Sequence, residues 1–300
     1  MKSAMALAAA QSGAIAPAVR RDIGRERRRF LALASPSAAV MTLLLLLPML
    51  WIVVQSLLDR EGNFGISNYT RLFADAAYAD SFWLTIRIAA IVTVICAVFG
   101  YALSYAMTLM PRWAAGLCLV LVALPFWTST LVRTYAWLVL LQHRGIVNTT
   151  LLNIGAITEP LALVHNEIGT IVGMVHLMLP FMVFPLYAGL KRIDADYMKA
   201  AMGLGAGPLY AFRRVYLPQS MPGLTAGAVL VFVVSLGFYI TPAILGGGRT
   251  IVMALAIERD VNLNFNWGPA SAAAFLFVAA VLAIFAFIAR FVSIERVFNR

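Results

Sequence analysis

The sequence predicts an all-α, polytopic membrane protein with six transmembrane helices. Of its 300 residues, 62% are hydrophobic and only 12% are charged, whereas about a quarter of the residues in a soluble domain are charged. Several apolar stretches also reach about 20 residues, the length that a helix needs to cross a hydrocarbon core of about 30 Å. Composition and segment length therefore both indicate a chain that lies in a bilayer.

Six stretches meet this length requirement. Each is expected to form a helix, because backbone polar groups in lipid must be satisfied within the segment. The expected spans cover residues 36–58, 82–109, 115–141, 167–190, 223–245 and 269–290. Prolines fall within these spans at Pro48, Pro125, Pro180, Pro185 and Pro242. They indicate kinks or unwound turns, because proline removes a backbone donor.

The basic residues predict the orientation of the spans. Sixteen of the 23 lysines and arginines fall on the side of the two termini and the 191–222 loop, and five on the other side. Cytoplasmic loops carry the excess of basic residues, so both termini are expected in the cytoplasm. We therefore divide the chain into a basic cytoplasmic tail, 1–35, expected to be disordered at its start, and a six-helix domain, 36–300. The net charge of +10 follows this pattern and does not indicate nucleic-acid binding.

Acidic residues collect on the opposite side of the expected membrane. They are Asp59, Glu61, Asp75, Asp80, Glu159, Glu167, Glu258 and Asp260. An acidic outer face would attract cations or a basic partner. Ordinary solvated loop charge explains the same distribution.

The loop between the fourth and fifth spans carries the most informative pattern. From Lys199 to Leu224 it reads KAAMGLGAGPLYAFRRVYLPQSMPGL, which predicts a short surface helix and then a corner bounded by prolines. Small residues let a second surface approach closely, and exposed apolar side chains such as Leu209 and Phe212 are unfavourable unless a partner covers them. The loop is either a docking element or a plain interfacial helix.

This order of small residues, glycine and prolines resembles the EAA loop of binding-protein-dependent ABC importer permeases. In that family the loop docks into a cleft on the ATP-binding subunit and passes its closure to the membrane helices. The resemblance implies the following ATPase-coupling residues: Lys199, Ala200, Ala201, Gly205, Leu209, Phe212, Leu217, Pro218, Pro222 and Gly223. Lys199 stands where the family has glutamate, so a reversed charge pair with the ATPase is one expectation.

Three further stretches resemble the spermidine/putrescine and opine-type group of these permeases. They are Leu124–Leu152, Leu179–Asp194 and Phe238–Gly247. The resemblance implies a type I ABC importer permease fold in the bacterial inner membrane and a small solute, a polyamine or a related cationic or amino-acid-like compound. It also implies three kinds of partner: a periplasmic binding protein, a homologous second permease, and two ATPase subunits that hold ATP and Mg.

Polar and aromatic residues within the spans are candidates for a translocation path, because polar groups at that depth are costly and face partners or cavities. The candidates are Trp127, Thr128, Arg133, Tyr135, Ser235, Tyr239 and Thr241. For Arg133, a gating role and a structural bond between helices are both open. The aromatic rings could face a cationic ligand or serve only for packing.

Catalytic, metal-binding and cofactor motifs are absent from the sequence. Gly246–Thr250 lacks the phosphate-loop pattern, so ATP hydrolysis is expected on separate subunits. Cys96 and Cys118 lie in apolar stretches, and the three histidines lack metal-ligand spacing. Two alternatives to an importer permease remain. One is a secondary transporter driven by an ion gradient, which often has internal repeats and an intramembrane carboxylate; the other is a structural membrane protein.

Overall fold

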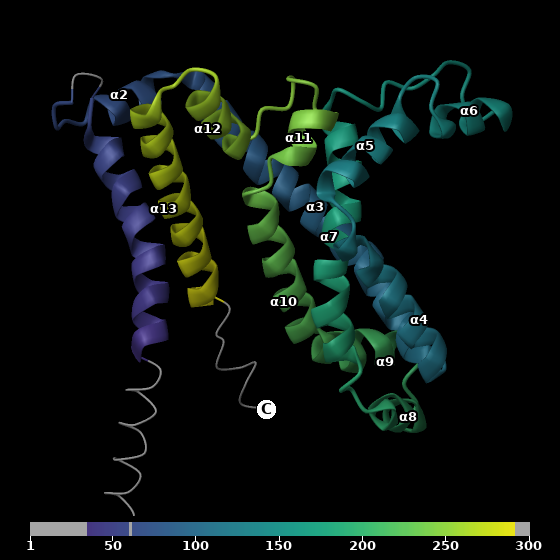
Figure 1. Ribbon diagram of the computed structural model, residues 1–300. Coiled ribbons are helices and arrows are strands. Elements are labelled where there is room, and N and C mark those ends of the chain that lie inside the picture. The colour runs from purple at the N-terminus through teal and green to yellow at the C-terminus, as the bar shows by residue number, and fades with distance from the viewer. Residues whose placement is uncertain (1–34, 60–61, 292–300) are drawn as a thin grey trace, which may run out of the picture. The chain divides into compact units, whose positions relative to one another are not determined.

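The computed structural model describes residues 35–59 and 62–291. Within these residues the chain forms helices joined by turns, with one isolated bridge between Leu58 and Phe64. The chain divides into two parts between Gln55 and Ser56, and Figure 1 shows the helices of both. The predicted basic tail lies outside the described residues up to position 34.

The first part consists, within the described residues, of most of one long helix. It runs over Ser35–Leu57 and is apolar enough to cross a membrane. The first expected span, 36–58, is thereby confirmed to within one residue at each end. Pro48 does not interrupt this helix.

Three helices form the centre of the second part: α3 (Ala76–Leu109), α7 (Glu167–Leu190) and α10 (Leu217–Leu236). Each contacts the other two. Apolar side chains from all three are buried between them, among them Ile88, Val92, Met174, Met178 and Val231. The fourth span was predicted with the same bounds as α7, and α3 begins six residues before the second expected span.

Glycines allow the three central helices to approach closely. A Cβ atom added at Gly100 of α3 would lie 2.6 Å from Cγ of Met182 in α7. One added at Gly223 of α10 would lie 3.2 Å from the carbonyl oxygen of Pro185. Small residues serve this purpose in membrane helix pairs, where van der Waals contact drives association.

The remaining helices surround this centre. α13 (Trp267–Phe291), the sixth span, packs against α2 (Ser67–Ala74) and α12 (Met253–Asn262). α8 (Ala195–Gly203) and α9 (Pro208–Ala211) lie at the end of the second part opposite to α2 and α12 (Figure 1).

The span expected over 115–141 is not one straight helix: the kink or unwound turn expected at Pro125 is confirmed, and it divides the span. The stretch contains α4 (Arg112–Ala123), a 3₁₀ turn η1 (Leu124–Trp127) and α5 (Thr130–Leu141), and α6 (Ile146–Asn153) follows. The two halves are bent by 101° at the break. Pro125 supplies no donor there, and Thr128 directs both its backbone N–H and its hydroxyl to the Pro125 carbonyl, at 3.2 and 2.9 Å. This local turn replaces helical hydrogen bonds.

The fifth span also differs from the predicted 223–245. α10 ends at Leu236, and a separate helix α11 (Ile240–Leu245) follows. At its other end the apolar helical stretch begins already at Pro208. The expected proline-bounded corner is therefore wrong: Pro218 lies in α10 directly after the π-helical segment Phe212–Tyr216, and the chain stays helical through it. Among the described residues, five helices are long and apolar enough to span, and the bent pair makes six.

Candidate functional site

The loop segment, residues 195–216, is built from α8, a tight turn, α9 and the π-helical segment η2 (Phe212–Tyr216). Asp194 begins α8 by accepting a hydrogen bond from the Asp196 backbone N–H at 3.0 Å. Gly205 ends it with φ of +90°, a left-handed conformation that glycine adopts without strain. The sequence thus forces two short helices with a fixed turn between them.

Apolar side chains of the loop segment point into solvent. Leu204 is 90% exposed and Leu209 is 70% exposed. We call the exposed apolar residues of this segment the docking face: Tyr197, Met202, Leu204, Leu209 and Tyr210. Large exposed apolar side chains gathered in one short segment are typical of a protein interface.

Lys199 pairs within its own helix. Its Nζ atom lies 2.8 Å from Oδ1 of Asp196, one turn earlier. This hydrogen bond, together with the charge of Asp196, raises the pKa of Lys199 above its ordinary value. The side chain therefore stays protonated at neutral pH, and the loop presents a positive charge where the resembling family has a glutamate.

Phe212 does not lie on the docking face, and the expectation that it is an exposed apolar side chain is wrong. Its ring is half-buried and points inward, with its centroid 5.5 Å from that of Tyr105 and 6.2 Å from that of Tyr101 on α3. The widened turn of η2 turns this ring away from solvent. Tyr101 and Tyr105 were missed in the sequence, although two tyrosines four residues apart on one helix indicate a shared face.

The other predicted coupling residues fall into two places. Ala200 and Ala201 lie on α8, beside Lys199. Leu217, Pro218, Pro222 and Gly223 lie in α10, behind the loop segment. Gly223 is buried against Pro185 and Leu186 of α7, so it sets the packing of two helices.

α5, α7 and α11 meet around a set of polar side chains within the apolar part of the fold. Hydroxyls of Thr134 on α5 and Thr241 on α11 lie 3.3 Å apart. Trp137 of α5 donates from Nε1 to Nδ1 of His176 on α7 at 3.1 Å. Arg133 donates to Thr130 at 3.3 Å, and its buried Nε has no hydrogen-bond partner among the described residues.

The structure does not bring the seven path candidates together. Thr241 contacts α5, which also carries Arg133 and Tyr135. Trp127 and Thr128 lie at the break before α5, and Trp127 is 82% exposed. The two others lie elsewhere: Ser235 is buried on α10, and Tyr239 sits between α10 and α11.

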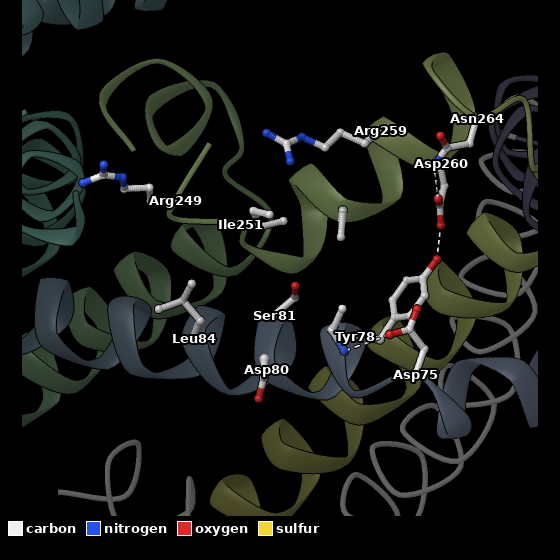
Figure 2. Close-up of a pocket in the computed structure, with 12 residues that line it drawn as sticks. Asp75, Tyr78, Asp80, Ser81, Leu84, Arg249, Ile251, Arg259, Asp260 and Asn264 are labelled. Atoms are coloured by element: carbon white, nitrogen blue, oxygen red, sulfur yellow. Dashed lines mark hydrogen bonds between the residues drawn. The ribbon is translucent and has the colours of Figure 1, made fainter. Parts of the chain in front are cut away.

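A pocket of about 410 Å³ lies between the start of α3 and α12 (Figure 2). Its lining includes three carboxylates and two guanidinium groups: Asp75, Asp80, Asp260, Arg249 and Arg259. Tyr78 donates its hydroxyl hydrogen to Asp260, and Asn264 donates to the same carboxylate at 2.9 Å. In Figure 2 the side chains of Arg249 and Arg259 point away from the labelled carboxylates. These residues belong to the acidic side that the sequence indicated.

Behind this pocket, α3 is bound to the start of α12 by a buried hydrogen bond. The hydroxyl of Thr85 accepts from the backbone N–H of Met253 at 2.8 Å and donates to the Ser81 carbonyl at 2.6 Å. Thr93 makes the same bond to its own helix, to the Ala89 carbonyl at 2.7 Å.

Thr85→Val is therefore expected to lower the free energy of unfolding by about 1–3 kcal/mol, because it leaves a buried N–H without an acceptor. Thr93→Val loses only the bond within α3 and serves as the matched control. Thermal unfolding of the purified protein in detergent measures both. Equal losses in the two variants would contradict the assigned role of Thr85.

Comparison with known proteins gives a consistent result. A sequence profile described as binding-protein-dependent transport system inner membrane component matches residues 100–299. The spermidine/putrescine transport system permease protein PotB of Haemophilus influenzae is 35% identical, covering 81% of this chain and 86% of that protein. PotB of Escherichia coli is 32% identical over 81% of this chain and 90% of its own length.

The fold also has a counterpart among solved structures. One chain of the crystal structure of a bacterial alginate ABC transporter, in complex with alginate pentasaccharide-bound periplasmic protein, superposes with a TM-score of 0.69. The match covers 87% of this chain and 93% of that chain, at 17% identity. At that identity the likeness concerns the fold alone.

Proposed function

The chain belongs to the family of binding-protein-dependent transport system inner membrane components, and from this we propose that it carries a polyamine, or a related amino-acid-like compound, through the bacterial inner membrane. It is a multi-pass permease of an ABC importer. The polyamine assignment is supported by the names of relatives that are more than 30% identical over four fifths of the chain.

The observation that carries the mechanism is the docking face. Its exposed leucines and tyrosines form an apolar surface on two short helices, which α10 continues directly into the centre of the fold. A nucleotide-dependent movement of a subunit bound there reaches the membrane helices without a flexible linker. ATP and Mg are held by that partner, because the sequence contains no phosphate-loop motif.

The proposed assembly follows the resemblance and the charge pattern. Two ATPase subunits dock in the cytoplasm, a homologous second permease completes the path, and a periplasmic binding protein delivers the solute. Both termini then lie in the cytoplasm, on the side with most of the basic residues. The pocket beside α12 faces the periplasm, where its carboxylates outnumber its guanidinium groups and favour the approach of a cation.

Leu209→Asp is expected to prevent the ATPase subunits from co-purifying with the permease, because it places an unpaired charge within an apolar interface. Leu263→Asp is the matched control, since Leu263 is also 70% exposed but lies beyond α12, at the opposite end. Affinity purification of the tagged permease with quantified ATPase content measures both variants. Retention of the ATPase by Leu209→Asp would rule out this face as the docking site.

A further inference from the structure

We propose that α3 is the helix that carries movement of the docked loop segment to the pocket beside α12, and that four aromatic rings form its attachment to the loop. This inference rests on the proposed function, since it requires an ATPase on the docking face. It assigns a positioning role to Tyr101, Tyr105, Phe212 and Tyr216, which we call the aromatic joint. None of these side chains touches the pocket.

The aromatic joint connects η2 to α3 through edge-to-face contacts. The Tyr105 ring lies 5.3 Å from Tyr216 at an interplanar angle of 78°, and the Tyr101 ring meets Phe212 at 88°. Phe212 and Tyr216 stack on each other at 5.6 Å. Edge-to-face pairs of this kind have a preferred geometry as well as buried area, so they hold two elements in one relative orientation.

A hydrogen bond fixes the same region to the first turns of α10. The Ser220 hydroxyl donates to the Leu217 carbonyl at 2.7 Å and lies 3.0 Å from the Tyr101 hydroxyl. Because a serine hydroxyl has a single hydrogen, Tyr101 is the donor and Ser220 the acceptor. Ser220 is fully buried, so this bond does not compete with water.

The turn that presents these rings is a π-helical segment of five residues. The Leu217 backbone N–H donates to the Phe212 carbonyl, five residues earlier. Such single wide turns are rare within helices and occur frequently at functional sites. Here the wide turn joins the docking face to α10 and directs two rings onto α3.

At its other end α3 is attached to the pocket. Tyr78 binds Asp260, and Thr85 accepts the buried N–H of Met253. Tyr101 lies 23 positions after Tyr78, a distance of about 35 Å along an α-helix. Within its 34 residues α3 contains neither proline nor a break.

The other long helices of the second part that reach the loop end contain proline or are bent. α7 contains Pro180 and Pro185, and α10 contains Pro222 behind its wide turn. The pair around the break at Thr128 is bent by 101°. A helix without proline or a break that is fixed at both ends moves as one body, so a shift at the aromatic joint displaces α12 and changes the pocket.

The test compares Tyr105→Leu, which removes the ring, with Tyr105→Phe, which keeps it. Both are placed in the full complex with its ATPase, partner permease and binding protein in proteoliposomes. Spin labels are attached at Ala79 on α3 and Asn262 on α12, which are both exposed. The distance between the labels reports the width of the pocket. Cys96 and Cys118 are replaced by serine so that only these two positions are labelled. Trapping the ATPase with vanadate is expected to change the distance between the labels.

We expect Tyr105→Leu to lose this distance change and about ten-fold of its uptake, in the range of typical coupling energies, while basal ATP hydrolysis stays within about two-fold. Tyr105→Phe should keep both the distance change and the wild-type rate of uptake. A full distance change in Tyr105→Leu, or none in a wild-type complex that transports with ATP, overturns the inference. If Tyr105→Leu does not assemble into the complex, Phe212→Leu is measured instead, and the same loss of the distance change and of uptake is expected. Loss of ATP dependence in the wild type would instead refute the proposed function.

Discussion

Gly205→Val is expected to reduce ATP-driven uptake about ten-fold while the chain still inserts and folds. Gly205 has φ of +90°, where a β-branched residue is strongly strained, by about 1–2 kcal/mol or more. The space around it is open, so nothing in the core is displaced. The turn between α8 and α9 relaxes instead, and the docking face loses the arrangement that fits the ATPase. Vesicle uptake and ATP hydrolysis measured on one preparation show this uncoupling.

Gly207→Val is the control for this substitution. Gly207 lies two residues further along, has φ of −65° and an equally open surrounding. Valine is compatible with that backbone conformation, so uptake should stay near the wild-type rate. Full uptake by Gly205→Val, or equal losses in both variants, would show that the left-handed turn has no part in coupling.

Gly223→Val is expected to have the largest effect on stability. A Cβ atom at this position would lie 3.2 Å from the Pro185 carbonyl oxygen and 3.3 Å from Cα of Leu186, both backbone atoms that cannot rotate away. α10 must move off α7, which separates the central helices. Overpacking costs about 1–3 kcal/mol, and the lost contacts around Gly189 and Gly227 add to it. We expect a clearly lower unfolding temperature and little folded protein.

Gly116→Val provides the comparison for Gly223→Val. Gly116 also lies inside a helix, α4, but no atom lies within 4 Å of a Cβ added there. The unfolding temperature of the Gly116→Val variant in detergent should match that of the wild type. If the two valine variants unfold at the same temperature, the close approach of α7 and α10 at Gly223 is not a determinant of stability.

Hydropathy and length predicted the spans of this chain well, because lipid imposes a length and satisfied backbone groups on every crossing. The fourth span has the predicted ends, and the first and sixth differ by one or two residues. Pro125 indicated the unwound turn before Thr128, but the size of the bend was not predicted, since hydropathy cannot distinguish a slightly kinked helix from a bent pair.

The loop between the fourth and fifth spans was identified from its order of small residues and prolines, but the roles within it were not. Leu209 and Phe212 look alike in sequence, and only their contacts separate an exposed side chain from one packed on α3. The sequence indicated that Gly223 is part of a proline-bounded corner, whereas in the structure it lies where α10 contacts α7. Such assignments depend on contacts between residues far apart in the sequence, such as Phe212 with Tyr105 and Gly223 with Pro185, which no local pattern contains.

ATP-dependent uptake is the most direct test of the central claim. Right-side-out or reconstituted vesicles containing this chain and its partner subunits are given radiolabelled spermidine and the binding protein outside, with ATP in the lumen on the side of the loop segment. We predict uptake that requires ATP and the binding protein and that persists when ionophores collapse all ion gradients. Uptake that stops with the gradient and continues without ATP would contradict the importer assignment and favour a secondary transporter.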